Sequence, residues 1–272
     1  MAERAIIGLT DWLKTPAGDY VLQWEQTHLD TAVADLFGFH ALQLGLPELD
    51  ALRSNRMPHR WVATESTLPA PPTEPDSPHP PRAAVALHCD FDALPFDTNS
   101  LDLVVLPHAL ELARDPHLAL REVERVLRPE GRVVIVGFNP ASLWGARQRL
   151  GQWRRRLMPG AGRPLFLPSA GDFMRFRRLR DWLRLLSFEV ESGRFGCYRP
   201  PLATQKWLTR FEWMERAGER WWPVFGAVYF VVAVKRVRGM RLVGLVRDQR
   251  QAAHAPAPVV ATHHNLEKKS SE

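Results

Sequence analysis

The sequence has little cysteine and no long apolar run, and each shortage excludes a class of protein. Two cysteines, Cys89 and Cys197, cannot build a disulfide scaffold or a four-cysteine zinc site. The longest uncharged apolar run, residues 221–234, has 14 residues and includes Pro223. A membrane-spanning helix needs roughly 17–25 such residues. No apolar segment of a signal peptide follows Met1, so we expect a reduced, cytoplasmic protein without a membrane span.

Lysine is also scarce, and arginine carries most of the positive charge. The net charge of +6 is spread unevenly. Residues 141–184 hold eleven arginines against two aspartates, which gives this stretch a net charge of +9. Such a stretch suits an anionic partner, for example nucleic acid, lipid headgroups or a phosphorylated substrate. The alternative, which we favour, is a solvated helix face in a protein that uses arginine throughout.

Apolar runs typical of buried strands alternate with helical patterns along the chain. The expected strands are residues 39–44, 60–64, 83–89, 101–106, 132–138, 188–195 and 226–234. Uninterrupted apolar runs are typical of strands that are covered on both faces, as in a parallel sheet with crossover helices. The sequence therefore predicts an α/β fold.

The remaining segments predict how the chain is divided. The spacing of Leu22, Leu29, Val33 and Leu36 indicates a helix within an N-terminal helical segment, residues 1–38. Helices are also expected at residues 116–127, 171–187 and 205–220, with a turn at 129–131. Residues 68–81 are half proline and predict an exposed extended loop inside a domain spanning 39–238. Residues 239–272 are expected to form a tail, disordered from about residue 248.

Three expected strands end in residues that can bind a nucleoside. Open α/β sheets bind ligands at the carboxyl ends of their strands. The first strand ends at Gly45, and Glu65 ends the second 20 residues later, a spacing typical of an acid that binds ribose hydroxyls. Asp90 and Phe91 end the third, where a carboxylate and the next backbone N–H could bind adenine. The alternatives are a strand-end turn for Gly45, a solvated acid for Glu65 and a turn cap for Asp90. No metal is expected, because no His, Cys and Asp residues have metal-ligand spacing.

The stretch Cys89–Pro140 resembles the middle of the class I S-adenosylmethionine-dependent methyltransferases, most closely the type 11 small-molecule group. The matching motifs are DFDALPF at residues 90–96, LDLVVL at 101–106 and LREVERVLRPEG at 120–131. The segments GFNPASLWG at 137–145 and RDWLRLLSFEV at 180–190 further resemble a proteobacterial subgroup of that family. With its flanking strands, the resemblance covers about residues 39–237.

The resemblance implies a fold, a cofactor and a reaction. The fold is a Rossmann-like sheet of seven mostly parallel strands, the last antiparallel, with an N-terminal helical extension. The cofactor is S-adenosylmethionine, and the reaction is methyl transfer to an unidentified, small-molecule acceptor. The implied cofactor-binding residues are Gly45, Leu46, Glu65, Asp90, Phe91 and Pro107. His108 follows the fourth strand and could serve as a general base or simply pack, and Glu111 could orient it or be a surface acid.

The sequence departs from the family in two places. Gln43 replaces an acid and Pro47 replaces the second glycine of the loop after the first strand, where proline adds bulk and removes an N–H. The proline-rich loop stands where the family has a helix, so the N-terminal helices or a partner would cover that face of the sheet. The aromatic-rich segment 206–225 either covers the acceptor pocket or belongs to the core.

Two rival functions stay open. The first is a methyltransferase fold that has lost its cofactor loop and now binds a partner or metabolite. The second is an RNA-directed methyltransferase that uses residues 141–184, where aromatic residues lie among the arginines as they do in base-stacking surfaces. We do not favour RNA, because Phe173 and Phe176 fall on the expected core face of their helix.

Overall fold

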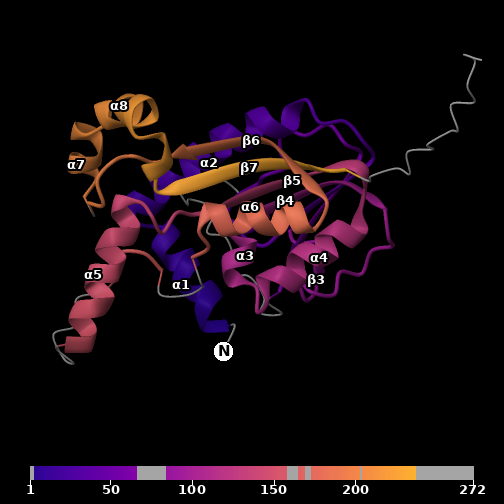
Figure 1. Ribbon diagram of the computed structural model, residues 1–272, viewed down its shortest axis with the longest axis horizontal. Helices are drawn as coiled ribbons and strands as arrows, with labels where there is room; N and C mark the ends of the chain where they lie inside the picture. The colour runs from indigo at the N-terminus through magenta and orange to yellow at the C-terminus, as the bar shows by residue number, and fades with distance from the viewer. Residues whose placement is uncertain (1–2, 66–83, 158–164, 169–172, 203, 237–272) are drawn as a thin grey trace, which may run out of the picture. The chain divides into compact units, whose positions relative to one another are not determined.

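The computed structural model describes residues 3–65, 84–157, 165–168, 173–202 and 204–236 (Figure 1). The expected proline-rich loop at 68–81 and the expected tail at 239–272 lie outside these described residues. Contacts between Cα atoms group residues 1–237 into one compact unit.

Seven strands form one sheet, as the resemblance implies (Figure 1). They are β1 His40–Leu44, β2 His59–Thr64, β3 Leu87–His88, β4 Leu101–Pro107, β5 Leu127–Phe138, β6 Phe188–Gly196 and β7 Val228–Lys235. Their order in the sheet is β3-β2-β1-β4-β5-β7-β6. The pairs from β3 to β5 are all parallel, and β7 runs antiparallel to both of its neighbours. The predicted Rossmann-like sheet with an antiparallel last strand is confirmed.

Eight α-helices and one 3-10 helix are described. The α-helices are α1 Glu3–Leu13, α2 Pro16–Ala34, α3 Ala109–Leu112, α4 Pro116–Val126, α5 Leu143–Leu157, α6 Phe176–Leu185, α7 Gln205–Arg210 and α8 Trp213–Trp221, and the 3-10 helix is Pro223–Phe225. Two of the starts follow from capping: the Thr15 side chain accepts the N–H of Gly18 in α2, and Asp115 accepts the N–H groups of His117 and Leu118 in α4. A proline at the first position of each helix needs no N–H partner there.

The two faces of the sheet are covered by different helices. On one face, side chains of α1 and α2 such as Leu13, Leu29 and Val33 share a core with Leu103 and Val105 of β4. On the other face, α3, α4 and α6 pack against the alternate side chains of the same strands. The sequence left open whether the N-terminal helices or a partner would cover one face of the sheet. In the structure, α1 and α2 cover it.

Several expected boundaries were wrong. The helix expected at 171–187 begins at Phe176 in α6, and residues 173–175 lie outside any helix. The strand expected at 132–138 begins at Leu127. The turn expected at 129–131 lies within these bounds as a bulge, because pairing with β4 shifts from Leu101–Leu127 to Leu103–Arg132 and Glu130 has a φ of 66°. β3 is confined to Leu87–His88, although the N–H groups of Ala86 and Cys89 on either side also donate to carbonyl oxygens of β2. The helix expected at 205–220 is two helices, α7 and α8, separated at residues 211–212.

Candidate active site

The carboxyl ends of β1 and β4 mark the point where the strand order reverses. β1 pairs with β2 on one side and with β4 on the other, so the crossover connections leave toward opposite sides here. Ligands of open α/β sheets bind in the crevice at such a point. All the predicted cofactor residues directly follow or end strands at this edge: Gly45 and Leu46 after β1, Glu65 after β2, Asp90 and Phe91 after β3, and Pro107 at the end of β4.

The backbone after β1 makes a tight left-handed turn. Gly45 has a φ of +77°, and Leu46 has a φ of 43°. A Cβ atom built on Gly45 would lie 3.6 Å from Cζ of Phe91 and 3.6 Å from Cβ of Ala109. The positive φ explains why glycine is needed. Phe91 and the start of α3 line the space above it, so the structure brings Gly45 and Phe91 together as predicted. The Leu46 side chain, by contrast, is buried in the core between the sheet and α2.

Gln43 holds the loop after β1 in place through four hydrogen bonds. Its buried Nε2 donates to the carbonyl oxygens of Gly45 (3.2 Å), Leu46 (3.0 Å) and Leu49 (2.7 Å). Its Oε1 accepts the N–H of Ala51 at 2.9 Å. A carboxylate could not donate to those three carbonyls. In the sequence, Gln43 is recognisable only as the replacement of an acid. The three carbonyl groups that need an amide donor meet it only in the folded chain.

One carboxylate oxygen of Glu65 has no hydrogen-bond donor. Its Oε2 is buried and has no hydrogen-bond partner, although the residue as a whole is half-buried. Burial raises the pKa of the Glu65 carboxyl; the carboxylates of Asp90 and Asp92 add to this, and Arg114 opposes it. The acids that end β2 and β3 are thus close enough to interact electrostatically. A buried acceptor normally has a donor, so this oxygen marks a place where a hydroxyl would be favourable.

The residues at this edge fit the nucleoside part of S-adenosylmethionine. Ribose supplies hydroxyl donors for the unpartnered oxygen of Glu65, and the adenine amino group is a donor for Asp90, whose side chain is exposed beside it. Pro107 is buried at the end of β4. The adenine role of Asp90 and the contact roles of Phe91 and Pro107 stay predictions.

His108 lies at the same edge but is fully enclosed. Its Nε2 is 2.8 Å from Oε1 of Glu25 in α2, and its Nδ1 is 2.8 Å from Oε2 of Glu111 in α3. The side chains of His108 and Glu25 are fully buried. Burial lowers the pKa of His108, but the two carboxylates outweigh that effect and raise the pKa to about 10. The imidazole therefore stays protonated at neutral pH.

This arrangement favours a structural role for His108. A protonated His108 donates from both ring nitrogens to carboxylates, so neither then has a lone pair available to accept a substrate proton. Glu111 also accepts the backbone N–H of Phe138 at the end of β5, which joins α2, α3 and the sheet through one ionic cluster. Glu111 orients His108, one of its two predicted roles, and it is buried, so it is not a surface acid. A general-base role for His108 stays a prediction that this geometry does not support.

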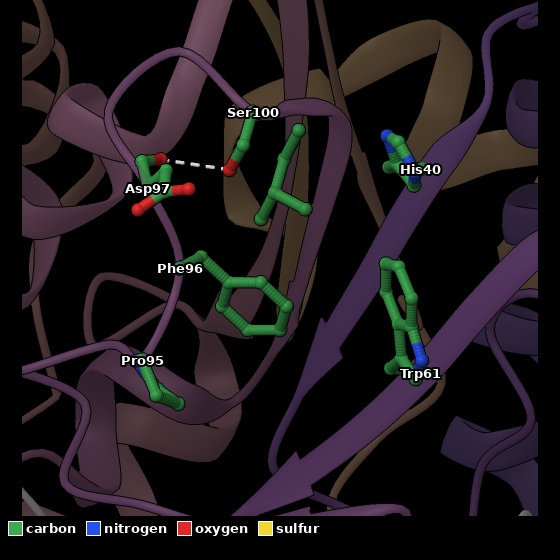
Figure 2. Close-up of a pocket in the computed structure, with 7 residues that line it drawn as sticks. His40, Trp61, Pro95, Phe96, Asp97 and Ser100 are labelled. Carbon is green, nitrogen blue, oxygen red and sulfur yellow. Dashed lines mark hydrogen bonds between the residues drawn. The ribbon is translucent and has the colours of Figure 1, made fainter.

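A hollow in the structure lies away from this edge. Figure 2 shows Trp61 facing Phe96 across it, with His40, Pro95, Asp97 and Ser100 around them. His40 begins β1, and the neighbouring Leu101 begins β4, so this hollow is at the amino ends of those strands. It is therefore separate from the crevice in which this fold class binds its ligands.

The aromatic-rich segment 206–225 belongs largely to the surface. Trp207, Trp213, Trp221 and Trp222 are between 49% and 71% exposed, which excludes for them the alternative that the segment belongs to the core. In the basic stretch, Trp144 is buried, and Phe173 and Phe176 pack against the two cores. The aromatics that lie among its arginines are thus mostly unavailable for base stacking.

The described residues hold no candidate metal site and no candidate membrane span. No three His, Cys, Asp or Glu side chains there are placed to hold a metal ion. No helix among them is both long and apolar enough to cross a membrane.

Comparison with known proteins gives a partial match to a family model and similarity to several relatives. A family model described as a methyltransferase domain matches residues 74–135. The chain is 31% identical to the protein YafS of Escherichia coli K12 over 180 residues, which cover 66% of this chain and 65% of that protein. It is 38% identical over 68 residues to the ubiquinone/menaquinone biosynthesis C-methyltransferase UbiE of Nitrosospira multiformis, covering 25% and 27% of the two chains. The chain therefore spans less than two thirds of either relative.

A solved structure shows the same fold. The SAM-dependent methyltransferase of Thermotoga maritima, described as a possible histamine N-methyltransferase, superimposes with a TM-score of 0.51 at 14% identity. The match covers 80% of this chain and 92% of that one. Residues 74–135 thus match a methyltransferase family model, and the sheet has the fold of class I methyltransferases. This family implies S-adenosylmethionine as the cofactor, in agreement with the resemblance found in the sequence.

Proposed function

We propose that this protein is an S-adenosylmethionine-dependent methyltransferase with a small-molecule acceptor. The observation that carries the proposal is the unpartnered, buried Oε2 of Glu65, which lies near Asp90 at the switch point of a methyltransferase sheet. Such an oxygen costs free energy in the empty protein and is satisfied when a ribose hydroxyl donates to it. The family resemblance alone would not distinguish a protein that binds the cofactor from one that has lost it.

The residues of the site bind and orient, and none of them has to react. Gly45, Glu65 and Asp90 would hold the cofactor, which when bound supplies an electrophilic methyl group on a sulfonium. Glu65 accepts from ribose, Asp90 accepts from the adenine amino group, and the turn at Gly45 admits the ligand close to the backbone. Because His108 has no free nitrogen, the preferred acceptor brings a nucleophile that is already ionised or carries a free lone pair. Holding two reactants in line is itself a large part of such catalysis.

The test is a calorimetric titration of the purified chain with S-adenosylmethionine and with S-adenosylhomocysteine. We expect both to bind and to raise the melting temperature, with lower affinity than in relatives whose glycine loop is intact. Glu65→Gln should weaken both ligands, and Asp97→Asn, an exposed acid at the opposite edge, serves as the matched control. If neither ligand binds at millimolar concentration, the enzyme proposal fails.

The four hydrogen bonds of Gln43 favour one competing function, a methyltransferase fold that binds a metabolite without catalysis. They fix the loop so that its carbonyl oxygens face inward, and Pro47 removes an N–H from the same loop. Incubation with S-adenosylmethionine labelled on its methyl group distinguishes the two functions. An enzyme transfers the label to a compound in a metabolite extract, and a binding module leaves all the label on the cofactor.

A further inference from the structure

Helix α5 exposes an apolar stripe to solvent. Leu143, Leu150, Trp153 and Leu157 are each between 48% and 59% exposed. Their spacings of seven, three and four residues place them on one face of the helix. The opposite face carries the buried side chains of Trp144 and Gln148, which attach α5 to the protein. Helix α5 is thus amphipathic, but its apolar stripe faces water and not the core.

Arginines border this stripe on both sides. Arg147 and Arg154 lie along one edge and Arg149 and Arg156 along the other at 100° per residue, and all four are exposed. No acidic residue occurs anywhere in α5. Long arginine side chains beside an apolar stripe can keep their charges in a polar headgroup layer while the stripe enters the apolar region below.

A second exposed apolar segment follows α8. Trp221, Trp222, Pro223, Val224 and Phe225 are five consecutive exposed residues, and none of them is polar. Runs of this kind are avoided on protein surfaces unless they have a function. Arg216 and Arg220 are exposed in the last two turns of α8, directly before the run. Tryptophan and arginine together are typical of surfaces that lie at a membrane–water boundary.

Hydrogen bonds join the beginning of α5 to the end of the run 221–225. Asn139, which lies between β5 and α5, donates from Nδ2 to the carbonyl oxygens of Val224 (2.8 Å) and Gly226 (2.9 Å). Trp144 donates to the carbonyl oxygen of Arg199, and Arg147 to that of Pro201, in the segment that leads into α7. In Figure 1, α5, α7 and α8 lie at the same end of the sheet.

We propose that the stripe of α5 and the run 221–225, together with their arginines, form a surface that binds an anionic lipid bilayer. The apolar side chains enter the boundary between headgroups and acyl chains, and the arginines pair with anionic headgroups. RNA fits less well, because three of the four stripe residues are leucines, which do not stack on bases. A second copy of the chain fits less well, because its α5 would bring another set of unopposed arginines to the same face. This surface does not depend on methyl transfer.

The test is co-flotation of the full chain with vesicles of phosphatidylcholine, either pure or containing a substantial fraction of phosphatidylglycerol. We expect binding to the anionic vesicles and at least tenfold less to the neutral ones. Leu150→Glu/Trp153→Glu should abolish it, and Arg154→Gln/Arg156→Gln should weaken it about tenfold or more, since each arginine near an anionic surface contributes about fivefold. Phe37→Glu, an apolar side chain that is 76% exposed before β1 at the other edge, is the matched control and should bind like the unmodified chain.

Four results would overturn the proposal. They are no flotation with anionic vesicles, equal flotation with neutral vesicles, equal loss in Phe37→Glu, and stripe variants that float normally. Unchanged melting temperatures of all variants would show that folding is intact. Binding of single-stranded RNA and size-exclusion chromatography are measured separately. If flotation is absent and the stripe variants abolish salt-resistant RNA binding, the surface binds RNA. If flotation is absent and they abolish a stable dimer, the surface binds a second copy of the chain.

Discussion

At the scale of single residues, the sequence located the site edge but not the partners of its side chains. The common location of Gly45, Glu65 and Asp90 could be predicted from the strand ends and their spacing, since parallel strands bring their carboxyl ends to one edge. The enclosure of His108 could not be predicted, because Glu25 is 83 positions away in the sequence. Nothing in a single sequence marks two residues that meet only when α2 packs on the sheet.

Asp90→Ala tests the adenine contact. A hydrogen bond to a charged acceptor contributes about 1.5–3 kcal/mol, so the affinity for S-adenosylmethionine should fall roughly 10- to 150-fold. Stability should change by no more than about 0.5 kcal/mol, because the side chain is exposed. Calorimetry and melting temperature are measured on the same variant. A loss of stability with unchanged affinity would instead make Asp90 a turn cap.

Gln43→Glu tests whether the amide is required by the loop. The change restores the kind of residue that the resembling family has, yet we expect it to lower the free energy of unfolding by about 2–4 kcal/mol. A buried carboxylate cannot donate to the carbonyls of Gly45, Leu46 and Leu49, and each unsatisfied buried group costs about 1–3 kcal/mol. Urea denaturation gives the value. Unchanged stability would show that the loop rearranges freely around an acid.

His108→Gln tests the buried ionic cluster through pH. The pKa of His108 is raised from 6.5 to about 10 in the folded protein, so its contribution to stability is complete below about pH 6.5 and is lost as the pH rises toward 10. The melting temperature of the unmodified chain should therefore exceed that of the variant most at pH 6, and the difference should shrink up to pH 10. A difference that does not change with pH would mean that His108 is neutral.

At the scale of elements, most strands and helices follow from apolar runs and caps, and the misses have local causes. The strands expected at 101–106 and 188–195 match β4 and β6 within one residue at each end. At 129–131 the predicted strand began too late: β5 starts at Leu127, and the turn that proline and glycine indicate forms as a bulge inside the strand, where Glu130 has a φ of 66°. At 206–225 the sequence pattern left open a pocket cover or core, and the exposed tryptophans exclude the core alternative for themselves.

Asp115→Ala tests the cap that starts α4. The Asp115 carboxylate accepts the N–H groups of His117 (2.9 Å) and Leu118 (3.1 Å). Loss of such a cap costs about 0.5–2 kcal/mol, and we expect a loss of about 1 kcal/mol in urea denaturation. Asp115→Asn keeps an acceptor oxygen and should recover most of the loss. If the asparagine variant is as destabilised as the alanine variant, the effect comes from charge and not from capping.

At the scale of the whole molecule, the N-terminal helices belong to the same compact unit as the sheet and are not an appendage. Their buried apolar side chains are Leu9, Trp12, Leu13, Ala17, Tyr20, Val21, Leu29 and Val33. Glu25 of α2 also pairs with His108 inside the sheet edge. The sequence predicted this segment as helical but separate, because apolar spacing reports that a helix has a buried face and not which surface covers it.

Deletion of residues 1–38 tests this dependence. A buried large apolar side chain contributes about 1.5–3 kcal/mol, so the deletion removes on the order of 10 kcal/mol of burial. That is comparable with the entire stability of a typical domain, about 5–15 kcal/mol. It also leaves His108 with one carboxylate partner in the core instead of two. We expect the shortened chain to lose its cooperative thermal transition in calorimetry.

Deletion of 239–272 is the control and should keep that transition, because the compact unit of the fold ends at Val237. A cooperative transition in the chain that begins at residue 39 would show that the sheet folds without α1 and α2, and that the helices serve the site alone.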